Sequence, residues 1–114
     1  MGIKIIKEKI SSDEFRRIAE DNFGNMVKAV VDIANEIIAL GGELHSDANE
    51  VLIEDGAKQP NIWGINIYSD KPKETRIEFD SLINIRPSMG NRSLKVEDEI
   101  IRNKIATIVD NLIE

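Results

Sequence analysis

The chain has 114 residues, a formal net charge of −6 at pH 7 and no cysteine. This length fits a single domain, residues 1–114, and the lack of cysteine excludes disulfides, thiolate metal sites and cysteine nucleophiles. The acidic balance disfavours nucleic-acid binding, which needs a basic face, and no apolar run reaches the roughly 18 residues that cross a bilayer. We therefore expect a cytoplasmic protein that makes no use of the membrane.

The first part of the chain predicts a strand followed by helical structure. Residues 3–7 are rich in isoleucine and predict a short strand. Ser11, with Glu14 three residues later, forms a capping box at the start of a helix. Residues 25–40 carry apolar side chains over more of a helical circumference than the roughly 100° stripe of a surface helix, so we expect a helix buried on several sides or paired with a partner. Whether 12–40 is one kinked helix or two stays open.

The middle of the chain contains weaker signals. Residues 43–45 predict a short extended stretch, 46–50 a turn or a single helical turn, and 51–54 a short strand. A turn is expected at Asp55-Gly56, because this dipeptide is a strong turn former.

The clearest pattern lies in the second half. Residues 63–68 and 77–86 alternate between apolar and polar side chains, which predicts two antiparallel strands joined by a hairpin loop at 70–74. Acidic residues 97–99 then start a last helix, whose isoleucines and leucine recur at helical spacing. The sequence predicts an α+β fold: an antiparallel sheet of three to five strands with about three helices packed on one face.

The strongest candidate site is the loop after the second of these strands. Residues 86–95 carry three positive charges and no negative one, and Met89-Gly90-Asn91 can point backbone N–H groups at an anion. We expect an anionic small molecule, a phosphate or carboxylate, to contact side chains Arg86, Ser88, Asn91, Arg92 and Ser93. The alternative is a structural loop, in which the arginines pair with Asp80, Glu97 and Asp98 and brace the last helix.

Two asparagines are further candidates for ligand binding. Asn66 and Asn84 are expected on the same face of adjacent strands, although asparagine is depleted in strands. Buried amides need hydrogen-bond partners, so the pair either binds a ligand or fixes a loop. A solvated sheet face with cross-strand pairs is the other interpretation.

His45 and Asp80 are the candidate catalytic residues. A histidine close to carboxylates can act as a general base or bind a metal, but a lone histidine at the end of a short strand is usually structural or simply exposed. No paired-histidine spacing is present and the acidic residues are scattered, so we expect no metal site. Nothing in the sequence indicates a particular cofactor.

The chain also resembles a family of small, free-standing prokaryotic proteins of unknown function. The residues that carry the resemblance are Gly-Gly-Glu-Leu-His at 41–45, Trp-Gly-Ile-Asn-Ile-Tyr at 63–68, Asp-Ser-Leu-Ile-Asn-Ile-Arg-Pro-Ser at 80–88, and Gly-Asn-Arg-Ser at 90–93. It spans nearly the whole chain, with Glu99 where members often carry proline. The resemblance implies an independent domain and no particular activity.

Three functional hypotheses follow. The first is a binding or interaction module with an anion-binding loop at 86–93, forming a homodimer through segment 25–40 or a sheet edge. The second is an enzyme acting on a phosphate-containing small molecule or nucleic acid, using His45 or Asp80 with Arg86 and Arg92; it requires His45 and Arg86 in one pocket. The third is a purely structural partner protein, which requires an exposed apolar patch.

Overall fold

The structure is a computed structural model that describes residues 2–114. Over these residues the chain forms three α-helices and a five-stranded sheet, which confirms the α+β class. The strands are β1 (Lys4–Ile6), β2 (Met26–Asp32), β3 (Ile37–Leu40), β4 (Ile62–Tyr68) and β5 (Ile77–Glu78). The helices are α1 (Ser12–Glu20), α2 (His45–Glu54) and α3 (Glu99–Leu112), and three short 3-10 helices are η1 (Gln59–Asn61), η2 (Leu82–Asn84) and η3 (Pro87–Met89).

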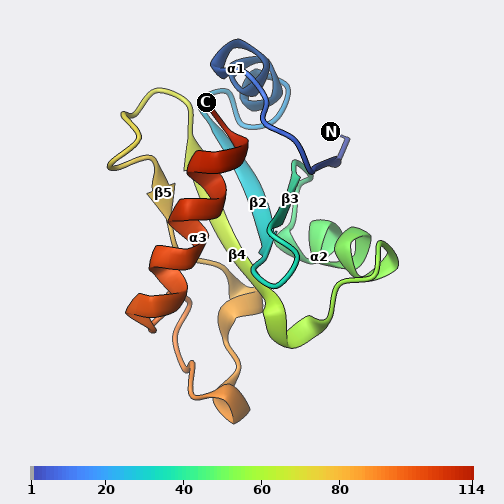
Figure 1. Ribbon diagram of the computed structural model, residues 1–114, viewed down its shortest axis with the longest axis vertical. Coiled ribbons are helices and arrows are strands. Elements are labelled where there is room, and N and C mark those ends of the chain that lie inside the picture. The colour runs from blue at the N-terminus through green and yellow to red at the C-terminus, as the bar shows by residue number, and fades with distance from the viewer. Residues whose placement is uncertain (1) are drawn as a thin grey trace.

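The sheet has the strand order β1-β3-β2-β4-β5, and every neighbouring pair is antiparallel. Strand β2 lies at its centre, where Val30 pairs with Ala39 on one side and with Gly64 on the other. Figure 1 shows α3 crossing in front of the sheet, with the C-terminal end of the chain close to α1.

Helices cover both faces of the sheet, so the expectation that all of them pack on one face is wrong. Alternate residues of β2, including Val27 and Val31, form the larger core together with residues of α1 and α3. The intervening Val30 belongs to a second core, which contains Ala48 and Leu52 of α2. The domain therefore has three layers, and α2 lies on the face opposite α3.

The helix expected over 25–40 is also wrong, and the question of one helix or two does not arise. This segment forms the β2–β3 hairpin, whose turn places Glu36 at φ 57° and is closed by Asp32, which accepts the N–H groups of Ala34 and Asn35. Central strands buried on both faces read as continuous apolar runs, which can be mistaken for buried helices. The apolar surface that suggested a homodimer is covered within the chain, and self-association stays a prediction.

Two expected strands differ as well. Residues 51–54 end helix α2, because Ala48 and Leu52, one turn apart, both face the sheet. The strand expected over 77–86 ends after Glu78, and the chain continues through η2 and η3. By contrast, the structure confirms the hairpin between β4 and β5, and the start of α1 at Ser11, whose side chain accepts the N–H of Glu14.

Candidate functional site

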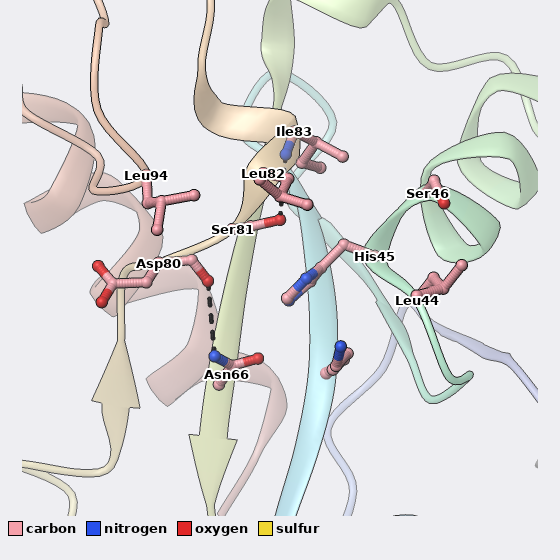
Figure 2. A pocket seen from close by; sticks show the side chains of 10 residues that line it. Leu44, His45, Ser46, Asn66, Asp80, Ser81, Leu82, Ile83 and Leu94 are labelled. Atoms are coloured by element: carbon pink, nitrogen blue, oxygen red, sulfur yellow. Dashed lines mark hydrogen bonds between the residues drawn. The ribbon is translucent and has the colours of Figure 1, made fainter.

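A cavity of about 450 Å³ opens beside the start of α2, on the sheet face that α2 covers. Figure 2 shows the α2 residues on one side of it and the segment after β5 on the other. The residues around it come from four parts of the chain: Lys28 of β2, Leu44 to Ser46 at the start of α2, Asn66 of β4, and Asp80 to Ile83 with Leu94.

The floor of the cavity is a polar row across the sheet. Lys28 pairs with Asn66 across β2 and β4, and Asn66 pairs with Glu78 across β4 and β5. The Asn66 amide nitrogen donates to Glu78 Oε1 at 2.7 Å, whereas its Oδ1 is buried and has no hydrogen-bond partner in residues 2–114. Within the same residues Lys28 forms no ion pair. The floor therefore offers a free ammonium group and an unsatisfied acceptor.

Helix α2 begins at this cavity without a side-chain cap. Its N-cap residue is Leu44, which cannot accept a hydrogen bond through its side chain, and the N–H groups of His45 and Ser46 meet no acceptor in the described chain. Unpaired N–H groups and the helix dipole place partial positive charge at such an end. This charge adds to that of Lys28 at the same cavity.

His45 lies in the wall with its ring held in one orientation. The Nε2 atom donates to the carbonyl oxygen of Ile65 at 2.7 Å, because a carbonyl can only accept. Burial lowers the pKa of His45, and the charge of Lys28 lowers it further, although the bond to Ile65 acts in the opposite direction. A lowered pKa favours the neutral ring, in which Nε2 carries the proton and Nδ1 the lone pair.

The rim of the cavity is aliphatic and exposed. Leu44, Leu82 and Leu94 are 56%, 76% and 44% exposed, respectively. Exposed leucines around a concave site with few polar groups are typical of ligand-binding pockets.

Apart from Leu94, the loop residues 86–95 lie outside the lining of this cavity. The loop does bind an anion: Oε2 of Glu97 accepts the N–H groups of Arg92 and Ser93 and the hydroxyl of Ser93, each at 2.8 Å. The Ser93 hydroxyl, followed by the two N–H groups, lowers the pKa of Glu97. The backbone geometry expected at Gly90, with φ 83°, is present. Ser88 and the Arg92 side chain are exposed and form no hydrogen bond or ion pair with residues 2–114.

Three of the expected ligand-binding side chains are engaged in the fold. The Asn84 amide bonds both backbone groups of Gly64, and the Asn91 amide donates to the carbonyl oxygens of Asn84 and Lys95. Arg86 donates to the carbonyl oxygens of Gln59 and Ile62, and its guanidinium carbon lies 4.2 Å from the centre of the Trp63 ring. The arginine–carboxylate pairs expected to brace α3 are absent from residues 2–114, where Glu97 binds backbone N–H groups instead.

Of the residues expected to act in chemistry, the cavity brings together His45, Asp80 and Asn66. Figure 2 shows the Asp80 carboxylate pointing away from the His45 ring. Arg86 does not line the cavity, so the pairing of His45 with Arg86 that the enzyme hypothesis requires is not formed. Within residues 2–114, no three histidine, aspartate or glutamate side chains lie close enough to hold a metal ion.

Sequence reasoning missed the residues that give the cavity its charge and its apolar rim. The helix expected over 25–40 includes Lys28, although this is the single charged residue in the run from Met26 to Val31. A lone charge within a buried strand was the available signal. No comparable signal marks Leu44, Leu82 and Leu94, because their exposure depends on tertiary structure.

Together, these features define a three-layer α+β domain with one face hollowed next to an uncapped helix. The chain belongs to the protein family described as Protein of unknown function (DUF5674), which matches residues 4–112. No curated protein and no solved structure matches the chain. Within residues 2–114, none of the helices has the length and apolar character that a membrane crossing requires.

Proposed function

We propose that the protein is a binding module for a small anionic molecule, and that its site is the cavity between α2 and strands β2 and β4. One observation carries the proposal: Lys28 and the uncapped start of α2 line the same cavity. Lys28 forms no ion pair in residues 2–114. Both features favour negative charge, and they lie at one concavity of ligand size.

The electrostatic part of the proposal is strengthened by the surroundings of Lys28. Its side chain is half-buried and its ammonium lies 5.6 Å from the centre of the Phe23 ring. A half-buried cation is screened less by salt than an exposed one, so an anion placed here gains more than at an ordinary surface lysine. An anion that also reaches the start of α2 would satisfy N–H groups that meet no acceptor in residues 2–114.

The anion-binding loop at 86–93 is a less favoured site for the same function. Its backbone N–H groups already hold the Glu97 carboxylate, so an external anion would have to displace it. We propose no reaction, because the Asp80 carboxylate points away from the His45 ring, and Arg86, which the enzyme hypothesis requires beside His45, does not line the cavity.

A thermal-shift panel tests the proposed site. The probes are inorganic phosphate, small carboxylates, sugar phosphates and nucleotides, applied to wild type, Lys28→Met and Lys104→Met. Methionine keeps an unbranched stem without the charge, and Lys104 is an exposed lysine on α3 that serves as the matched control. A probe at about a hundredfold excess over Kd stabilises the native state by about 2.7 kcal/mol.

We expect at least one anionic probe to raise the melting temperature of wild type and Lys104→Met but not of Lys28→Met. Arg92→Ala adds a separate arm, because this exposed side chain can be removed without breaking a hydrogen bond. A probe that Lys28→Met still binds and Arg92→Ala loses would move the site to the 86–93 loop. If no probe raises the melting temperature of wild type, the proposed function is rejected.

A further inference from the structure

We infer that the ligand is a monocarboxylate with an aliphatic chain, its head at Lys28 and its chain along Leu44, Leu82 and Leu94. This inference rests on the proposed function and specifies the chemistry of its ligand. Three properties of the cavity carry it: the number of charges, the kind of apolar surface, and the order in which the two occur from floor to rim.

The charge of the cavity suits one negative charge rather than two. Among the described residues that line it, Lys28 is the sole fixed cation and Asp80 the sole carboxylate. Glu78 adds a second carboxylate on the neighbouring strand, where it holds the Asn66 amide. A phosphate monoester carries nearly two charges at pH 7, for which the lining offers one ammonium, with the Asp80 carboxylate in the same lining and Glu78 on the neighbouring strand. A carboxylate needs only the one cation and the N–H groups of α2.

The apolar surface suits an alkyl chain rather than a ring system. No phenylalanine, tyrosine, tryptophan or arginine is present among the described residues that line the cavity, so a nucleobase would find only the His45 ring to stack on. The rim instead presents Leu44, Leu82 and Leu94, with Ile83 beside them. Flexible aliphatic side chains pack well against methylene groups, whose burial is favourable in proportion to their area.

The arrangement of charge and apolar surface gives the ligand its direction. Lys28 belongs to the central strand β2, whereas Leu82 and Leu94 belong to the segment that follows β5 and forms one wall of the cavity. Figure 2 shows Leu82 and Leu94 on one side of the cavity and Leu44 on the other. A carboxylate on the floor would therefore direct its chain outward between leucines on both sides.

Isothermal titration calorimetry with butyrate, hexanoate, octanoate, octanol and octyl phosphate tests the inference, at concentrations below micelle formation. We expect the Kd to fall roughly fourfold for each added methylene group. Octanol and octyl phosphate should both bind more weakly than octanoate. Lys28→Met should weaken octanoate by about tenfold or more, the cost of losing a charged contact.

Two variants with equal exposure test the position of the chain. Leu82 and Ile100 are both 76% exposed, but Ile100 lies on α3, away from the cavity. Leu82→Ser should weaken octanoate by about fivefold, and Ile100→Ser should leave its Kd unchanged. A chain-length series without a trend, or equal losses in both variants, would overturn the inference.

The two proposals fail in different ways. Tight binding of octyl phosphate that depends on Lys28, together with weak binding of octanoate, would reject the carboxylate and keep the anion site. Absence of binding for every probe, in both this series and the thermal-shift panel, would reject both.

Discussion

The side chain of Asn84 takes the place of a neighbouring strand for Gly64. Its Oδ1 accepts the N–H of Gly64 at 2.8 Å, and its Nδ2 donates to the carbonyl oxygen of the same residue at 2.9 Å. A third bond joins Nδ2 to the carbonyl oxygen of Leu94 at 3.0 Å. Gly64 allows this approach, since a Cβ there would lie 2.6 Å from the Cβ of Ser81. The contact fixes the segment that forms one wall of the cavity.

Asn84→Ala should be strongly destabilising. The substitution leaves the N–H and the carbonyl oxygen of Gly64 without partners, in a place where Asn84 is fully buried, whereas the carbonyl oxygen of Leu94 keeps the N–H of Ser81. At about 1–3 kcal/mol for each unsatisfied group, we expect the free energy of unfolding to fall by about 3 kcal/mol or more. Urea unfolding measures this change. The exposed Asn103→Ala on α3 should stay within about 0.5 kcal/mol of wild type, and an equally small loss for Asn84→Ala would contradict the structural role.

Arg86→Lys should destabilise the fold without affecting the cavity. Lysine cannot bond the carbonyl oxygens of Gln59 and Ile62 together while stacking on Trp63. We expect a loss of about 1–3 kcal/mol, read from urea unfolding through the fluorescence of Trp63, the one tryptophan of the chain. Arg92→Lys, on an exposed side chain, is the control. Wild-type stability in Arg86→Lys would leave this arginine free for a ligand, as the sequence alone suggested.

Glu97 should make the start of α3 sensitive to acid. The Ser93 hydroxyl and the N–H groups of Arg92 and Ser93 lower the pKa of Glu97 below its ordinary value of 4.5. A depressed pKa of an acid gives stability that is present above pH 4.5 and is lost as the pH falls through the lowered value. The stability difference between wild type and Glu97→Gln should therefore shrink on acidification, measured as urea midpoints from about pH 7 to pH 3. The exposed Glu50→Gln serves as control; a difference independent of pH would count against the carboxylate bonds.

His45 should titrate below the ordinary histidine pKa of 6.5. Burial lowers the pKa, and Lys28 contributes in the same direction. A base with a depressed pKa stabilises the fold above pH 6.5, and this stability is lost as the pH falls below 6.5 through the lowered value. The ring protons of the single histidine report the pKa directly by NMR. A midpoint at or above 6.5 would mean that the ring is not buried as described.

The sequence predicted helix α1, helix α3 and the β4–β5 hairpin because their signals are local. Capping residues, helical spacing and period-two alternation all act within a few residues. The sequence did not predict the β2–β3 hairpin, because Val30 and Val31 face different cores and both faces of strand β2 are therefore apolar. Its β-branched residues favour a strand, whereas its continuous run of apolar side chains is also typical of a buried helix.

The site was predictable only in part. His45, Asn66 and Asp80 stood out by residue type, and all three line the cavity. The basic loop also stood out, but the anion that its N–H groups hold is Glu97, four residues beyond Ser93. The Glu97 carboxylate reaches the loop because of the path that the backbone takes between Ser93 and α3. This path depends on how α3 packs.

The most direct test of the proposed site is an NMR titration of the 15N-labelled protein with octanoate, followed residue by residue. We expect saturable shifts at Lys28, at the N–H groups of His45 and Ser46, and at Leu82 and Leu94, with none at 88–93. In Lys28→Met the same shifts should need about tenfold more octanoate, or more, to reach saturation. Shifts confined to 88–93, or none at the cavity at saturating octanoate, would contradict the placement of the anion at the start of α2.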